Sequence, residues 1–212
     1  MFKRLFNDWR SNSDCSSESD RIEVKQAAIL HVDIVGSTRL VQENLCLAHR
    51  QIRHLYGRIC RLSAAQNGVA RELRGDAAVV EFESAADALR AALAIHAAHA
   101  MIDKTRLGRI NPQLRTGLSY GAVISEENMI TGEAVIRAQR LEQLAQPGQV
   151  FVDDCLREAL PDDCEFKLES MGVRRLKGFD SATTVYLANR RGFASMDTLA
   201  RHFNTLALPH SA

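Results

Sequence analysis

HVDIVGST, residues 31–38, follows the apolar run VKQAAIL at residues 24–30. An apolar, β-branched run that ends in a carboxylate and then in Gly-Ser-Thr predicts a strand with Asp33 at its end, and a turn that opens a helix. We expect Ser37 or Thr38 to cap this helix, whose free N–H groups favour an anion. Asp33 can hold a divalent cation that faces the same anion. An Asp in this position is as often a turn or capping residue, so both interpretations stay open on this stretch alone.

The composition narrows the class of protein. The chain has 212 residues and a formal net charge of +1, which is typical of one domain with short appendages and argues against a nucleic-acid surface. The five cysteines form no CxxC pair and no secretory signal precedes them, so we expect reduced thiols and a cytoplasmic protein. His96 and His99 lack a cysteine or carboxylate at metal spacing, so we expect both on a helix surface.

The chain divides into three parts. Residues 1–23 combine a short amphipathic helix with a Ser-rich linker, residues 24–190 form the main domain, and residues 191–212 are a tail that can form one more helix. Within the domain, periodicity and turn residues predict helices at 38–67, 85–102, 131–146 and 155–160, and strands at 24–33, 69–73, 77–82, 114–120, 122–125, 149–152, 166–168 and 185–187. Hairpins mixed with crossovers predict an α+β fold, with helices over a mixed sheet.

A second carboxylate changes the interpretation of Asp33. Arg74-Gly75-Asp76 forms the tip of the predicted hairpin, so Asp33 and Asp76 are expected to face each other across adjacent strands. Two such carboxylates can bind a pair of divalent cations, which activate a hydroxyl and neutralise a triphosphate during in-line attack at phosphorus. Without Asp33 beside it, Asp76 would be interpreted as a turn residue.

Five stretches in order resemble the catalytic domain of class III nucleotidyl cyclases: HVDIVGST, RELRGDAAVVEF (71–82), RTGLSYGAVI (115–124), TGEAVIRAQRLEQLAQPGQVFVD (131–153) and GVRRLKGFDSATTVYLA (172–188). The resemblance implies a ferredoxin-like sheet and a head-to-tail homodimer with two active sites at its interface. Each site would take its metal-binding carboxylates from one chain and other groups from the second chain.

The resemblance also assigns roles. Asp33, Asp76 and the Ile34 carbonyl would hold two Mn²⁺ or Mg²⁺ ions, and Arg140 would stabilise charge on the α-phosphoryl group. Lys177 would grip the terminal phosphates together with the amides of Val35 to Thr38, which include Gly36, Ser37 and Thr38. The position of the family's ribose-orienting asparagine is Ile136 here.

The base-reading positions depart from the family's adenylyl pattern. Glu72 replaces the usual lysine, and Met129 replaces the usual aspartate or threonine, so adenine loses both contacts. Glu72 matches the guanylyl-type residue, but its polar partner is missing. A carboxylate can also accept from uracil N3–H, which cytosine lacks, so Glu72 favours UTP over CTP.

Other side chains can complete the base pocket. Arg71 and Arg74 can supply donors to uracil oxygens, and Tyr56 either narrows the pocket or packs in the core.

A short cyclase with this pocket is similar to the uridylate cyclases of bacterial Pycsar antiphage systems, whose product activates a separately encoded effector. The hypothesis is therefore cyclisation of UTP to cyclic UMP. The alternatives are a guanylyl or divergent adenylyl cyclase, and an inactive regulatory module. Ile136 favours the inactive module, and retention of both aspartates, Arg140 and Lys177 opposes it.

Overall fold

The structure is a computed structural model that describes residues 23–106, 113–126 and 129–190. Its elements are β1 (Val24–Val35), α1 (Ser37–Glu43), α2 (Leu45–Ala64), β2 (Val69–Arg74), β3 (Ala77–Phe82), α3 (Ala85–Arg106), β4 (Gln113–Glu126), β5 (Met129–Gly132), α4 (Glu133–Leu144), β6 (Val150–Val152), α5 (Asp154–Glu158), β7 (Phe166–Arg175) and β8 (Ala182–Arg190). The expected N-terminal arm and linker, up to residue 22, and the expected C-terminal tail lie outside the described residues.

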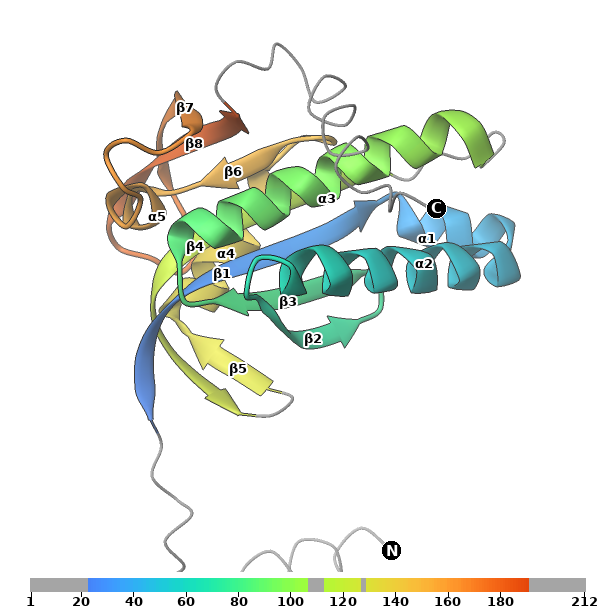
Figure 1. The fold of residues 1–212 in the computed structure, drawn as a ribbon, viewed down its shortest axis with the longest axis horizontal. Helices are drawn as coiled ribbons and strands as arrows, with labels where there is room; N and C mark the ends of the chain where they lie inside the picture. Colours follow the sequence, from blue (N-terminus) through green and yellow to red (C-terminus); the bar gives the residue numbers. More distant parts are fainter. Residues whose placement is uncertain (1–22, 107–112, 127–128, 191–212) are drawn as a thin grey trace, which may run out of the picture.

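One eight-stranded sheet organises the fold (Figure 1). The strand order in the sheet is β2-β3-β1-β4-β6-β8-β7, and β5 pairs with the C-terminal end of β4. The pairs of β1 with β3 and with β4 are antiparallel, whereas β4 and β6 are parallel. The predicted α+β fold with a mixed sheet is confirmed.

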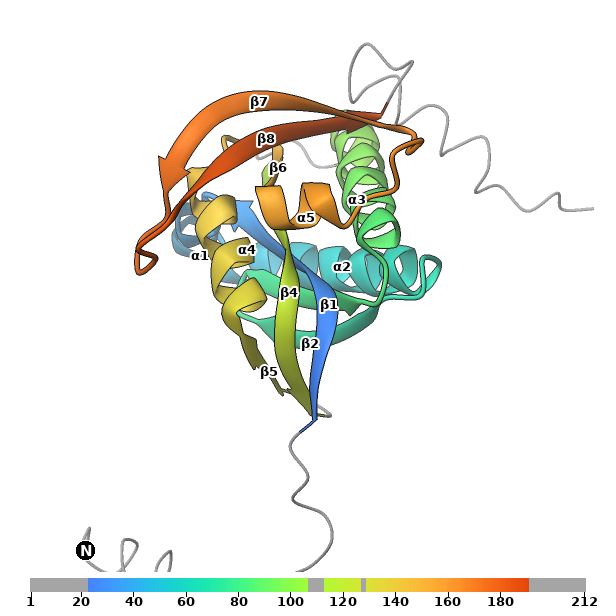
Figure 2. The ribbon, with the colours of Figure 1, turned by 90° about the vertical axis from the view of Figure 1, so that its left-hand side faces the viewer.

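Helices cover both faces of the sheet. Successive residues of β1 point to opposite sides, and because both sets are apolar, both faces need a covering layer. Leu30 and Val32 face α2 and α3, and join the larger core. Ala27 and Ile29 point the other way and pack against the start of α4. Figure 2 shows α4 and α3 on opposite sides of β1 and β4. None of the described helices is both long and apolar enough to cross a membrane.

Gly117 on β4 lets α4 lie directly on the sheet. A Cβ atom at Gly117 would lie 2.1 Å from the Ala138 carbonyl oxygen and 2.3 Å from the Glu142 nitrogen. Both contacts are with backbone atoms, so a larger residue would push the helix away. This close approach brings Glu142 over β1, in the neighbourhood of Asp33.

Four local predictions were wrong. The single helix at 38–67 is two helices, because Asn44 is extended and its side chain accepts from the Leu47 N–H at 2.9 Å, which caps α2. Gly121 does not interrupt β4, which continues to Glu126. Thr131 lies in β5, a strand that the sequence analysis missed, and α4 begins at Glu133. Strands β7 and β8 are also longer than predicted.

The prediction that His96 lies on the helix surface was also wrong. His96 is only 5% exposed, and its Nε2 lies 2.8 Å from the Thr116 hydroxyl. Burial lowers the pKa of His96 to about 3, with His99 nearby acting in the same direction. His99 is half-buried and its Nδ1 lies 2.9 Å from an Arg58 nitrogen. The Ala-rich α3 packs so closely against the sheet that the His96 side chain is enclosed with it.

Candidate active site

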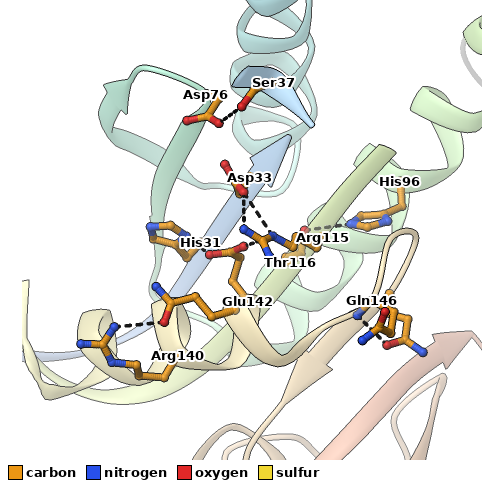
Figure 3. Close-up of polar contacts among 12 residues, drawn as sticks. His31, Asp33, Ser37, Asp76, His96, Arg115, Thr116, Arg140, Glu142 and Gln146 are labelled. Atoms are coloured by element: carbon orange, nitrogen blue, oxygen red, sulfur yellow. Dashed lines mark hydrogen bonds and ion pairs between the residues drawn. The ribbon is translucent and has the colours of Figure 1, made fainter. Parts of the chain in front are cut away.

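Asp33 lies near the C-terminal end of β1, on the face that α4 covers, and is 9% exposed. The antiparallel register places Arg115 of β4 directly opposite it. Arg115 donates from Nη2 at 2.8 Å and from Nε at 3.1 Å to the same oxygen, Asp33 Oδ2 (Figure 3). Arg115 was not among the site residues predicted from the sequence. The strand predicted at 114–120 gave a signal for Arg115, because an antiparallel neighbour of β1 must place one of its residues opposite Asp33.

Asp76 lies in the turn between β2 and β3, and accepts a hydrogen bond from the Ser37 hydroxyl (Figure 3). The sequence predicted that Ser37 or Thr38 caps α1, and this prediction was wrong. The N-cap is Gly36, in the left-handed conformation at φ 78°, and no side chain caps the helix. The Gly36 turn instead brings the Ser37 hydroxyl from the end of β1 to the hairpin tip.

Tyr56 holds the hairpin tip from the α2 side. Its hydroxyl lies 2.8 Å from the Gly75 carbonyl and 3.2 Å from the Ala77 carbonyl, on either side of Asp76. The ring packs against the larger core. Of the two roles considered for Tyr56, packing in the core is therefore the one that its contacts show.

A third acidic side chain and a histidine lie close to Asp33. Glu142 of α4 is 3% exposed and forms an ion pair with Arg115, and its Oε2 lies 3.6 Å from His31 Nδ1. Burial raises the pKa of Glu142 to about 7, against the opposing effect of Arg115. Burial also lowers the pKa of His31 to about 4, and Arg115 adds to that effect. Neither Glu142 nor His31 was singled out from the sequence.

The balance of charge in this region favours a cation. Asp33, Asp76 and Glu142 share one Arg115, and the pKa of Asp33 is raised by burial and by the Asp76 carboxylate even though Arg115 lowers it. Repulsion between neighbouring carboxylates is relieved when a cation binds between them. Within the described ranges, no three His, Cys, Asp or Glu side chains converge as a metal cage. Two hard oxygen ligands fit Mg²⁺ or Mn²⁺ that is also held by phosphates.

Arg140 and Lys177 lie together, but apart from Asp33. Arg140 Nε donates to the Lys177 carbonyl at 3.3 Å, and Nη1 donates to Gln143 at 3.1 Å. Arg140 is two residues before Glu142 on α4 and points away from Asp33 (Figure 3). Ile136, one turn earlier, is 48% exposed. One chain therefore presents two separate groups of predicted site residues.

Glu72 and Met129 lie on neighbouring parts of the sheet. Glu72 pairs with Val79, and Val79 pairs with His31, so Glu72 lies on the same face of the sheet as His31. Met129 pairs with Glu126 at the connected end of the β4–β5 hairpin and is 48% exposed.

The two arginines of the hairpin differ in their surroundings. Arg71 is engaged within the protein, with Nε 2.8 Å from Glu81 Oε2 and Nη1 3.1 Å from the Glu126 carbonyl oxygen. Arg74, by contrast, is exposed at the end of β2. The donors of Arg71 that reach Glu81 and Glu126 are therefore already used in this structure.

The comparisons with known proteins identify the family. Residues 20–189 match the family model described as adenylate and guanylate cyclase catalytic domain, so the chain belongs to that family. A crystal structure of an adenylate/guanylate cyclase/hydrolase from Silicibacter pomeroyi is similar, with a TM-score of 0.70 and 28% identity over 78% of this chain and 96% of that chain. The guanylyl cyclase Cya2 shares the fold, with a TM-score of 0.67 and 21% identity over 78% of this chain and 92% of that chain.

Curated relatives carry adenylate cyclase names. Putative adenylate cyclase 3 of Rhizobium meliloti is 26% identical over 79% of this chain, and the pH-sensitive adenylate cyclase MT1302 of Mycobacterium tuberculosis is 27% identical over 78%. These matches cover only 29% and 41% of the two relatives' lengths. The similarity therefore concerns one catalytic domain within longer proteins.

Proposed function

We propose that this chain cyclises a nucleoside triphosphate, with UTP preferred, to the 3′,5′-cyclic mononucleotide and pyrophosphate. The observation that carries the proposal is the excess of acid at the end of β1, where Asp33 and Asp76 lie with Glu142 around one arginine. Family membership supports the reaction class, and the excess of acid supports a cation site at the end of β1.

Asp33, Asp76 and the Ile34 carbonyl would hold two Mg²⁺ or Mn²⁺ ions. When bound, these ions would neutralise the triphosphate and lower the pKa of the ribose 3′-hydroxyl. The amides of Gly36, Ser37 and Thr38 would meet the β- and γ-phosphates, since the left-handed Gly36 turn precedes them. Arg115 lies beside Asp33 and would add a positive charge near the same phosphates.

In the proposed reaction, the 3′-oxygen forms a bond to the α-phosphorus and gives up its proton to solvent water. The bond from the α-phosphorus to the bridging oxygen breaks, and pyrophosphate leaves with that electron pair. Arg140 would stabilise the charge that builds on the α-phosphoryl oxygens, and Lys177 would hold the terminal phosphates. Neither residue reaches Asp33 of its own chain, so both would come from the partner subunit of a head-to-tail dimer.

Exposed apolar side chains support a dimer. Leu73 on β2, Met129 on β5 and Ile136 on α4 stand on elements that carry proposed site residues, and Met171 and Val173 stand on β7, which ends shortly before Lys177. Large apolar groups that are exposed on elements near proposed site residues are typical of a surface that a second copy covers. The dimer predicts complementation. In an equal mixture of Asp76→Asn and Arg140→Ala chains, half of the dimers would be mixed with one intact site each, giving about a quarter of wild-type activity.

The preference for UTP rests on Glu72 and Met129. Glu72 can accept from uracil N3–H, and the apolar Met129 offers no polar partner to a purine. The product would then serve as a messenger for a separate effector, as in the pyrimidine-cyclase defence systems that the sequence resembles.

The second candidate is a guanylyl or divergent adenylyl cyclase. The guanylyl-type carboxylate at Glu72 favours GTP, and the names of the relatives favour ATP or GTP. An inactive module is the third candidate, favoured by Ile136 in place of the ribose asparagine.

One experiment separates these candidates. The purified protein is incubated with ATP, GTP, CTP or UTP and Mn²⁺, and cyclic products and pyrophosphate are quantified by mass spectrometry. Cyclic UMP as the dominant product supports the proposal, and cyclic GMP or cyclic AMP supports the second candidate. Nucleotide binding without any cyclic product favours the inactive module.

A further inference from the structure

A second cluster of charges lies on the same face of the sheet, toward the other end of β1. We call it the clamp, and it consists of Lys25, Arg71 and Glu81. Glu81 is 4% exposed, forms an ion pair with Lys25, and accepts from Arg71 Nε at 2.8 Å. Although burial acts to raise the pKa of Glu81, the two cations outweigh it and the pKa lies below its usual value.

A β-bulge in β2 directs the Arg71 side chain toward Glu81. The register of β2 against β3 shifts between Ala70 and Glu72, so Arg71 is the extra residue of the bulge. Bulges re-aim side chains, and here the Arg71 side chain turns inward until only 18% of it is exposed. The clamp thereby joins β1, β2 and β3 through Glu81.

Arg71 also reaches a fourth strand. Its Nη1 donates to the Glu126 carbonyl at 3.1 Å, and Glu126 pairs with Met129 across the β4–β5 hairpin. Arg71 itself immediately precedes Glu72. One guanidinium thus links the strand that carries Glu72 to the hairpin that carries Met129, and a planar guanidinium can hold two partners at a fixed angle.

We infer that Arg71 is a positioning residue that determines base specificity, because it fixes the spacing between Glu72 and Met129 without touching the base. The inference rests on the proposed function and changes the role expected for Arg71, which was as a direct donor to uracil. Two donors of Arg71 are held by Glu81 and Glu126. Arg71 therefore influences base specificity by fixing the position of β2, which carries Glu72, relative to the β4–β5 hairpin, which carries Met129.

The test measures selectivity rather than activity alone. For wild type and for Arg71→Ala, kcat/KM is measured with all four ribonucleoside triphosphates and Mn²⁺. We expect the ratio between the best and second-best substrate to fall about tenfold, the scale of a change in pocket shape, mainly through KM. The Mn²⁺ concentration for half-maximal activity should stay within about twofold, because Asp33 and Asp76 are unchanged.

Two further variants separate positioning from general stability. Arg90→Ala removes an ion pair of the same kind, from α3 to Glu165 at 2.8 Å, on the opposite face of the sheet, and should leave the selectivity ratio unchanged. Arg71→Lys can keep the ion pair with Glu81, but a single ammonium does not reproduce the fork to Glu126. It should therefore melt near the wild-type temperature and still lose selectivity. Wild-type selectivity in Arg71→Ala or in Arg71→Lys overturns the inference.

Binding distinguishes failure of this inference from failure of the proposed function. The 3′-deoxy forms of the four triphosphates lack the attacking hydroxyl, and their Kd values with Mn²⁺ are measured by calorimetry. If wild type yields no cyclic product but binds one base preferentially, and Arg71→Ala loses that preference, the proposed function fails and the inference stands. If wild type makes a cyclic nucleotide and Arg71→Ala has the same base preference in binding and turnover, only the inference fails.

Discussion

Two groups of charged residues on one face of the sheet differ in how well their charges are balanced. In the clamp, Lys25 and Arg71 surround the single carboxylate of Glu81, whose pKa is lowered despite burial. At the other end of β1, Asp33, Asp76 and Glu142 share one arginine, and burial raises the pKa of Asp33 and Glu142.

The difference indicates what each group does. A buried carboxylate with two cations is fully compensated and needs nothing further, which suits a structural link. A surplus of carboxylates costs free energy until a cation arrives, which suits a site that binds metal and phosphate. Charge balance therefore separates the proposed chemical site from the clamp, although both are built from the same residue types.

The largest expected effect tests the acid surplus. Asp76→Asn keeps an acceptor for the Ser37 hydroxyl but removes one of the two proposed metal carboxylates. Loss of several kcal/mol of transition-state stabilisation corresponds to a fall in kcat/KM of about 10³-fold, with loss of Mn²⁺ binding in calorimetry. Asp163→Asn, an exposed acid in the loop before β7, is the control. Turnover that survives in Asp76→Asn would contradict a metal role for this residue.

The next effect tests the compensated group. Glu81→Gln leaves Arg71 and Lys25 without their shared counter-charge, and breaking such a buried pair costs about 3 kcal/mol of the free energy of unfolding. Urea denaturation measures the loss. Asp76→Asn is the comparison, and it should not lower the stability because it removes a charge from a repelling group. Equal losses in the two variants would mean that charge balance does not distinguish the two groups.

A pH titration examines Glu142 directly. Its folded pKa of about 7 lies above the ordinary 4.5, so between these values the folded protein holds a proton that the unfolded chain has released. Wild-type stability therefore falls, from this group, as the pH rises from 4.5 to 7. Glu142→Gln lacks that loss, so the difference in unfolding free energy, variant minus wild type, should rise with pH by up to about 1.4 kcal/mol per unit. A pH-independent difference would show that Glu142 is ionised throughout.

How much of this arrangement the sequence predicts depends on whether the signal is local. Asp33 follows an apolar run and precedes a Gly, and Asp76 follows a Gly at a hairpin tip, so both positions were predicted from their immediate neighbours. Arg115 and Glu142 are 82 and 109 positions from Asp33, and only the register of β1 against β4 and the close packing of α4 at Gly117 bring them to it.

The errors in the fold have a similar origin. The expected exposure of His96 came from the helix pattern alone, whereas the small alanines of α3 let it sink against β4 and enclose the imidazole beside Thr116. Likewise, the direction of the Arg71 side chain could not be predicted, because the sequence gives no sign of the bulge that turns it toward Glu81. In both cases the orientation of the side chain depends on tertiary packing, which local sequence patterns do not reveal.

The smallest expected effect acts on the proposed metal-binding group, Asp33 and Asp76, without changing its charge. Tyr56→Phe removes the hydroxyl that bonds the Gly75 and Ala77 carbonyls, and the pKa of this hydroxyl is raised by burial and by the nearby Asp76. Loss of this contact should cost about 1 kcal/mol of stability and weaken Mn²⁺ binding about fivefold, because the hairpin tip then holds Asp76 less firmly. Base selectivity should not change, since the clamp is intact. If Tyr56→Phe alters selectivity and not Mn²⁺ affinity, Tyr56 belongs with the base pocket and the two groups are coupled through the β2–β3 hairpin.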